Sequence, residues 1–136
     1  MTQRDELKTG TVLRYSFLWS REHERGKEEG RKPRPVAVAF NIGTKIGLVP
    51  ITTQQPASRK AGIEIPDAEK SRAGLDIGLR LWVIPDEMNI DDPTESYYIE
   101  PNSVLGQFST ALMERIKIEI RNAIGQLRQV PRRQRI

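Results

Sequence analysis

The sequence predicts a mainly β domain with a C-terminal helix (β+α), in which short antiparallel strands form a small, strongly bent barrel. Two observations carry this prediction. About five to seven short runs rich in Val, Ile, Thr and aromatic residues are separated by polar connections that contain Gly and Pro. One helical pattern follows them. The 136 residues are expected to form a single domain, with its core over about residues 9–127 and an Arg-rich tail over residues 128–136.

The first expected strand covers residues 11–19, a β-branched and aromatic run. Strict alternation breaks near Tyr15, which predicts a bulge or a bend, and Trp19 is assigned to the core. Residues 21–32 follow and are almost all charged, so they are expected to form a surface loop. Loops of this kind often cover an active site or receive a partner, although an ordinary solvated charge run fits the composition nearly as well.

A hairpin is expected over residues 35–52. Its two apolar runs are joined through residues 41–45, which have the polarity and the glycine that a hairpin connection needs. With a side-chain period of two, Val36, Val38 and Phe40 should lie on one face of the first strand.

The next segments predict four further strands and a short helical turn. Residues 63–65 form a short strand that ends at Pro66, and Asp67 can cap a helical turn that ends near Gly74. Residues 79–84 are apolar nearly throughout and are expected to run through the middle of the sheet. The acidic residues 86–96 contain Pro93 and are expected to be irregular, and late strands are expected over residues 97–99 and 104–108.

Ser109 has the right position to cap a terminal helix over residues 110–127. The apolar residues of this segment recur at steps of three and four, which makes one stripe able to pack on a sheet or on another subunit. They are Leu112, Ile116, Ile120, Ala123, Ile124 and Leu127.

Composition excludes several kinds of site. The chain has no cysteine, which excludes disulfides, thiolate zinc sites and a thiol nucleophile. His23 is the single histidine, so a multi-histidine metal site is excluded as well. A carboxylate site for magnesium fits the composition, but no acidic cluster demands one. We therefore expect no metal and no cofactor.

Charge and hydropathy indicate where the protein works. No apolar run is long enough to span a bilayer and the N-terminus has no apolar signal region, so a cytoplasmic protein without membrane contact is expected. The net charge is +4, and cations cluster at Arg31, Lys32 and Arg34 and again within residues 128–136. Such clusters attract phosphate backbones. For the C-terminal cluster alone, a loose solubilising tail is the favoured interpretation.

Arg34 and Thr52 are the strongest candidate site residues. They stand at the start of one hairpin strand and the end of the next, so antiparallel pairing should bring them together. In RNA the 2′-hydroxyl can attack the adjacent phosphorus if the charge that grows on the phosphate is stabilised. Arg34 offers a fork of donors to phosphate, and the Thr52 hydroxyl can donate one hydrogen bond. The competing interpretations are a surface ion pair of Arg34 with Glu28 or Glu29, and a Thr52 hydroxyl that satisfies a strand end.

The order and spacing of several motifs resemble the MazF/PemK family of toxin ribonucleases from toxin–antitoxin pairs. The resemblance covers about residues 9–127. The motifs that carry it are Gly10-Thr11-Val12, the charged loop closing on Gly30, Arg34-Pro35-Val36-Ala37-Val38, Pro50-Ile51-Thr52-Thr53-Gln54, Ile63-Glu64-Ile65-Pro66, Leu75-Asp76, Leu81-Trp82-Val83-Ile84-Pro85-Asp86-Glu87-Met88-Asn89 and the final helix.

The resemblance implies an SH3-like barrel and a metal-independent, sequence-selective endoribonuclease that cuts single-stranded RNA. The products would carry 2′,3′-cyclic phosphate and 5′-hydroxyl ends. The family's catalytic Arg and Thr fall on Arg34 and Thr52. A homodimer and a neutralising antitoxin are implied as partners.

Further candidates surround this pair. His23, Glu28, Glu29 and Asp86 are candidate catalytic or substrate-binding residues. Histidine is the side-chain type suited to proton transfer near neutral pH, although a solvated loop residue is the favoured interpretation of His23. The two glutamates resemble the family's Glu-x-x-Gly segment, and Asp86 stands where some members have an acidic residue. Candidate RNA-binding residues are Arg31, Lys32, Thr53 and Gln54.

One departure supports an alternative. Family members with that acidic residue carry an arginine two positions earlier, where this chain has Ile84. The alternative function is a non-catalytic toxin or binding module on the same fold, directed at gyrase, RNA or another protein.

Overall fold

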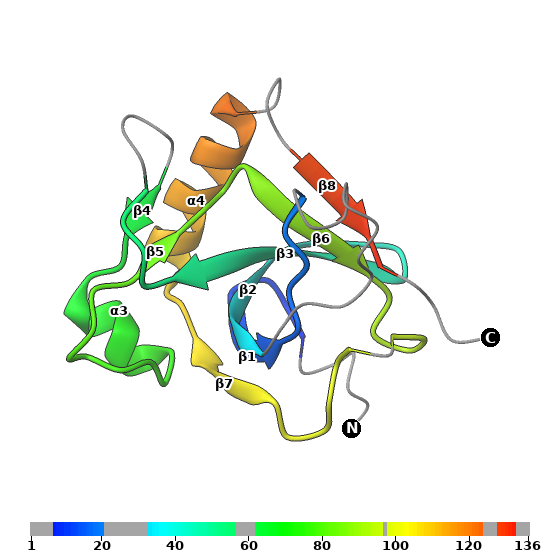
Figure 1. Ribbon diagram of the computed structural model, residues 1–136, viewed down its shortest axis with the longest axis horizontal. Coiled ribbons are helices and arrows are strands. Elements are labelled where there is room, and N and C mark those ends of the chain that lie inside the picture. The colour runs from blue at the N-terminus through cyan, green and yellow to red at the C-terminus, as the bar shows by residue number, and fades with distance from the viewer. Residues whose placement is uncertain (1–6, 21–32, 57–61, 97, 124–127, 133–136) are drawn as a thin grey trace.

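The computed structural model describes residues 7–20, 33–56, 62–96, 98–123 and 128–132. Within these residues the strands run in the order β4-β5-β3-β2-β1-β7, and β6 pairs with both β3 and β8. Figure 1 shows the strands curling into a half-closed barrel with α4 against one side, so the predicted β fold with a C-terminal helix is confirmed. The strands are β1 Thr11–Tyr15, β2 Arg34–Ile42, β3 Lys45–Thr52, β4 Ile63–Glu64, β5 Trp82–Val83, β6 Glu87–Asp91, β7 Val104–Gln107 and β8 Arg128–Pro131, and the helices are α3 Asp67–Arg72 and α4 Thr110–Asn122.

The sheet buries a separate apolar cluster on each of its two faces. One cluster joins the sheet to α4 and includes Val12, Ala37, Val49, Ile51 and Ile116. The other includes Leu13, Tyr15, Val36, Val38 and Leu48. Residues from these strands therefore alternate between two buried environments, which explains why their sequences are apolar almost throughout.

The β2–β3 hairpin forms as predicted, but Phe40 does not share a face with Val36 and Val38. The pairing register shifts between Val38 and Phe40, so a β-bulge turns Ala39 and Phe40 toward the helix-side cluster. The Phe40 ring then covers Gly47, where an added Cβ atom would lie 2.4 Å from the ring. A pattern of period two does not reveal such an extra residue.

The middle of the chain differs from the prediction in three ways. β5 contains only Trp82 and Val83, because Leu79 and Arg80 belong to an exposed loop, and it lies between β3 and β4. Asp67 is the first residue of α3, and its side chain does not cap the helix. Residues 87–91, which were expected to be irregular, form β6.

The terminal helix α4 begins as predicted. Ser109 Oγ accepts a hydrogen bond from the backbone N–H of Leu112 at 3.2 Å, which is the expected N-cap. The helix ends at Asn122 rather than near residue 127. Leu112 and Ile116 are buried against the sheet, whereas Ile118 on the opposite face is 46 % exposed.

The C-terminal segment is part of the sheet. The sequence placed the edge of the core near residue 127, whereas β8 pairs in parallel with β6 and Arg132 is 4 % exposed. A loose basic tail is therefore wrong for residues 128–132. The expected strand over residues 97–99 is also absent at Tyr98 and Ile99, and Tyr97 lies outside the described residues.

The Arg132 side chain lies in a buried polar cluster with Ser16, Tyr15, Tyr98 and Asn89. Its Nη1 donates hydrogen bonds to the carbonyl oxygen of Ser16 at 2.6 Å and to Asn89 Oδ1 at 2.7 Å. Its guanidinium carbon lies 3.7 Å from the ring centroid of Tyr98 and 5.4 Å from that of Tyr15. These contacts offset part of the cost of burying a cation.

The same cluster contains a buried carboxylate. Asp91 Oδ2 accepts hydrogen bonds from the hydroxyls of Tyr15 and Ser96, both at 2.6 Å, and Asp91 is 1 % exposed. Burial raises the pKa of the Tyr15 phenol well above its ordinary value, and the nearby Asp91 carboxylate raises it further.

Candidate functional site

Arg34 and Thr52 lie side by side at one end of the hairpin. The pairing of Val36 with Pro50, continued by two residues, places Arg34 opposite Thr52. Both residues line a single cavity of about 360 Å³, here called the hairpin cavity. The hairpin thus brings together the cation and the hydroxyl that the sequence singled out.

The Arg34 guanidinium is held against an aromatic ring. Its central carbon lies 5.3 Å from the centroid of Trp19, which packs edge to face on Phe17 at a centroid distance of 5.3 Å. Trp19 was assigned to the core, and it is half-buried at the border of the second apolar cluster. Its ring limits the positions that the guanidinium can adopt.

The segment before Trp19 is fixed by the buried polar cluster. Asn89 accepts a hydrogen bond from the Leu18 N–H at 2.9 Å and donates one to the Leu18 carbonyl at 2.7 Å. Arg132 binds Asn89 and also the carbonyl of Ser16. The C-terminal segment therefore helps to hold the backbone that carries Trp19, and Trp19 contacts Arg34.

Thr52 and Thr53 line the hairpin cavity, whereas Gln54 contacts Thr52 without lining it. The Oγ1 atom of Thr52 accepts a hydrogen bond from the backbone N–H of Gln54 at 3.1 Å, so the hydroxyl proton can be donated to a ligand. Thr53 is exposed and lines the hairpin cavity, whereas Gln54 is exposed and is not among the residues that line it.

Two charged residues of the hairpin cavity were not predicted as site residues. Arg14 is the exposed residue of β1 and pairs with Pro35, next to Arg34. Asp76 comes from the loop after α3. Arg14 is the single charged residue in an otherwise apolar strand, and this feature could have identified it as a site residue. Asp76 reaches the cavity only through tertiary structure. Apolar side chains complete the lining, namely Ile51, Leu75, Leu79, Leu81 and Leu105.

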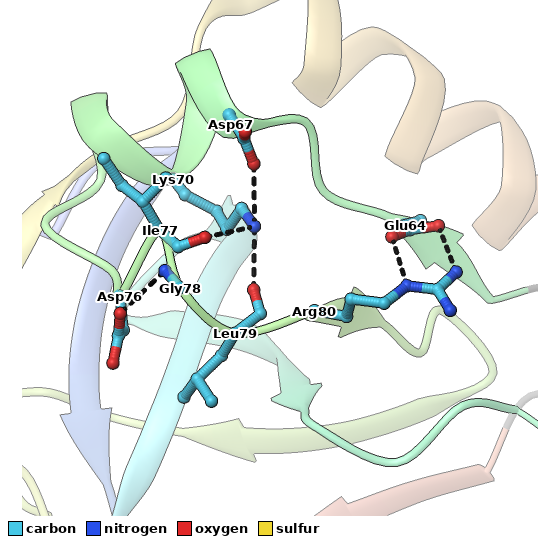
Figure 2. Close-up of polar contacts among 8 residues, drawn as sticks. All are labelled: Glu64, Asp67, Lys70, Asp76, Ile77, Gly78, Leu79 and Arg80. Carbon is cyan, nitrogen blue, oxygen red and sulfur yellow. Dashed lines mark hydrogen bonds and ion pairs between the residues drawn. The ribbon is translucent and has the colours of Figure 1, made fainter.

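The loop that carries Asp76 is tied to α3 by Lys70, as Figure 2 shows. Lys70 Nζ donates to the carbonyl oxygens of Ile77 at 3.2 Å and Leu79 at 2.7 Å, and it pairs with Asp67 at 2.9 Å. The Lys70 side chain is only 6 % exposed. A buried ammonium with three oxygen partners fixes the loop as one wall of the hairpin cavity.

A second cavity of about 440 Å³ is lined by Lys70 and by Ile77 and Gly78 of this loop, and it shares Leu79 with the hairpin cavity. Arg80 and Glu64 line it and form two hydrogen bonds of 2.9 Å, drawn in Figure 2. These bonds lower the pKa of the Glu64 carboxyl. The Arg80 guanidinium also lies 4.9 Å from the Trp82 ring centroid, much as Arg34 lies over Trp19.

Of the remaining candidates, the structure describes only Asp86. Asp86 is half-buried in the turn between β5 and β6 and is not among the residues that line the hairpin cavity. Its neighbour Glu87 accepts hydrogen bonds from the backbone and the hydroxyl of Ser20. The candidates of the charged loop, which are His23, Glu28, Glu29, Arg31 and Lys32, lie outside the described residues.

Within the described part of the chain, no three side chains of His, Cys, Asp or Glu are grouped as a metal ion would require. None of the helices described in Figure 1 has the length and apolar character needed to cross a membrane.

Comparisons with known proteins give the fold. No protein-family model matches the sequence, and no curated protein matches it. An endoribonuclease from a mycobacterial species is structurally similar, with a TM-score of 0.59 and 14 % identity over 91 % of this chain and 96 % of that one. A chain of the MazE–MazF complex from Deinococcus radiodurans is similar with a TM-score of 0.56 and 11 % identity, over 88 % of this chain and 95 % of that one. The chain therefore has the fold of MazF-type endoribonuclease toxins.

Proposed function

We propose that this protein is an endoribonuclease toxin that cleaves single-stranded RNA sequence-selectively and without a metal ion. The observation that carries the proposal is the hairpin cavity, in which Arg34 and Thr52 stand at adjacent ends of β2 and β3. The likeness of the fold to an endoribonuclease and to a MazE–MazF complex supports it.

In the proposed reaction, the 2′-hydroxyl of one nucleotide attacks the phosphorus that joins it to the next. Negative charge grows on the non-bridging oxygens, and the Arg34 guanidinium, held over Trp19, donates hydrogen bonds to them. The Thr52 hydroxyl accepts a hydrogen bond from Gln54 and donates its own proton toward the same phosphate. The products are a 2′,3′-cyclic phosphate and a 5′-hydroxyl.

The partners proposed for the protein follow from the same likeness. One structural neighbour is a MazE–MazF complex, so we propose that a cognate antitoxin neutralises this chain. A homodimer and a cytoplasmic location complete the proposal. Sedimentation of the purified protein tests the homodimer, which a monomer at micromolar concentration would contradict.

The test of the activity is incubation of the purified protein with a long single-stranded RNA in the presence of EDTA, followed by analysis of the fragment ends. Discrete cuts with cyclic-phosphate and 5′-hydroxyl ends are expected. In Arg34→Ala, kcat should fall by about 10²–10³, because one preorganised donor to the transition state is lost. Arg34→Lys should recover little, since lysine lacks the planar fork.

Arg80→Ala is the matched control. It removes an arginine that also lies over a tryptophan, but one that lines the second cavity, so cleavage should persist. Thermal unfolding of each variant separates lost chemistry from lost folding. Full cleavage by a folded Arg34→Ala protein would contradict the role of Arg34. Intact RNA with the folded wild-type protein would favour a non-catalytic binding role.

A further inference from the structure

Asp76 supplies the one carboxylate among the described residues that line the hairpin cavity. The proposed reaction requires a group that accepts the proton of the attacking 2′-hydroxyl. Arg34 cannot accept a proton, and a threonine hydroxyl is a poor base. Resting on the function proposed above, we propose that Asp76 is the general base of the reaction.

The backbone around Asp76 gives the carboxylate a defined orientation. Asp76 Oδ1 accepts a hydrogen bond from the N–H of Gly78 at 2.8 Å, as Figure 2 shows. A carboxylate can accept about four hydrogen bonds, so this one leaves capacity to receive a substrate proton. Asp76 is also exposed, and a ligand in the cavity can therefore reach it.

The loop is fixed on both sides of Asp76. On one side, Lys70 binds the carbonyl oxygens of Ile77 and Leu79. On the other side, Gly74 has a φ of +71° and approaches β7 so closely that a Cβ atom there would lie 2.3 Å from the carbonyl oxygen of Leu105. A base on this wall is thus preorganised, which general acid–base catalysis requires.

The cavity is also electrostatically suited to a base beside a phosphate. A carboxylate alone would repel the phosphate, but Arg14 and Arg34 line the same cavity and more than balance its charge. Asp86, the acidic candidate from the sequence that the structure describes, does not line this cavity.

The O–H bond of the 2′-hydroxyl breaks and its proton passes to the Asp76 carboxylate. The 2′-oxygen forms a bond to phosphorus while the bond from phosphorus to the 5′-oxygen breaks. The departing 5′-oxygen takes a proton from water, and Asp76 later returns its proton to solvent.

Asp76→Asn is the decisive variant, because the amide oxygen can still accept the Gly78 hydrogen bond while the basic group is lost. We expect kcat to fall by about 10²–10⁴ with little change in KM. Asp76→Glu keeps a carboxylate and should recover part of the loss. Glu114→Gln removes one negative charge from an exposed position on α4 and should leave cleavage unchanged.

An RNA with sulfur in place of the bridging 5′-oxygen distinguishes a base from an acid, because a thiolate leaves without being protonated. Asp76→Asn should remain slow on this substrate relative to wild type. Recovery of the wild-type rate would make Asp76 the acid and overturn the proposal. Equal cleavage of ordinary RNA by wild type and folded Asp76→Asn would overturn it while leaving the proposed nuclease intact. An inactive wild type would instead refute the nuclease itself.

Discussion

Replacing Arg132 with alanine should destabilise the protein by about 3–5 kcal/mol, because a buried cation and its hydrogen bonds to Ser16 and Asn89 are lost. The side chain donates to the Ser16 carbonyl at 2.6 Å and to Asn89 Oδ1 at 2.7 Å, and hydrogen bonds from a charged donor contribute about 1.5–3 kcal/mol each. Its contact with the Tyr98 ring at 3.7 Å adds about 2 kcal/mol. The cost of desolvating the guanidinium offsets part of this sum.

Urea unfolding followed by circular dichroism measures this loss of unfolding free energy. In thermal unfolding, the midpoint temperature should fall by roughly 10–20 °C. Arg115→Ala, which removes an exposed arginine from α4, is the control and should change stability by less than about 0.5 kcal/mol. A loss below about 1 kcal/mol in Arg132→Ala would refute the reasoning, because it would mean that the buried cation contributes no more than a surface one.

Two further outcomes are expected. In wild type the unfolding free energy should fall above about pH 10, because the raised pKa of Tyr15 lets the unfolded chain release that proton first. Urea unfolding at several alkaline pH values should show a slope shallower by up to about 1.4 kcal/mol per pH unit in Tyr15→Phe, and equal slopes would contradict this. Ile116→Ala should lower the unfolding free energy by about 2–5 kcal/mol in the same assay, because Ile116 is fully buried. Ile118→Ala, at an exposed position of the same helix, should lower it much less. Similar losses in the two variants would contradict the packing of α4 against the sheet.

The elements that the sequence predicted correctly have local signals. The hairpin follows from two β-branched runs and a polar turn, and the start of α4 follows from a serine cap ahead of an apolar stripe. Each signal lies within the element that it predicts. Arg34 and Thr52 could be placed together for the same reason, since the pairing of neighbouring strands fixes their positions.

The elements that were missed depend on distant partners. β6 contains Asn89 and Asp91, which are polar in sequence yet buried, because they bind Leu18, Tyr15 and Ser96. Hydrophobic periodicity identifies apolar faces, so it cannot detect a strand whose buried residues are satisfied by hydrogen bonds. β8 was missed for a similar reason. It lies in an Arg-rich segment, which is typical of a solvated tail, and the sequence does not show that the neighbouring Arg132 is buried by its contacts with Ser16 and Asn89.

Two charged residues of the candidate site, Arg14 and Asp76, also depend on contacts that are distant in sequence. Arg14 lies on a predicted strand, but its distance from Arg34 depends on the pairing of β1 with β2. Asp76 depends on the Lys70 contacts and on the close approach of Gly74 to β7. No pattern within residues 67–79 predicts these contacts.

The bond between Arg132 and Ser16 joins residues that are 116 positions apart in the chain. Closing so long a loop costs conformational entropy before any contact rewards it, so this joint should form late in folding, after the local β2–β3 hairpin. Interactions that form late affect the rate of unfolding more than the rate of folding. The lifetime of the folded protein, and with it the persistence of the Trp19–Arg34 contact, should therefore depend on Arg132, which directly follows the last described strand.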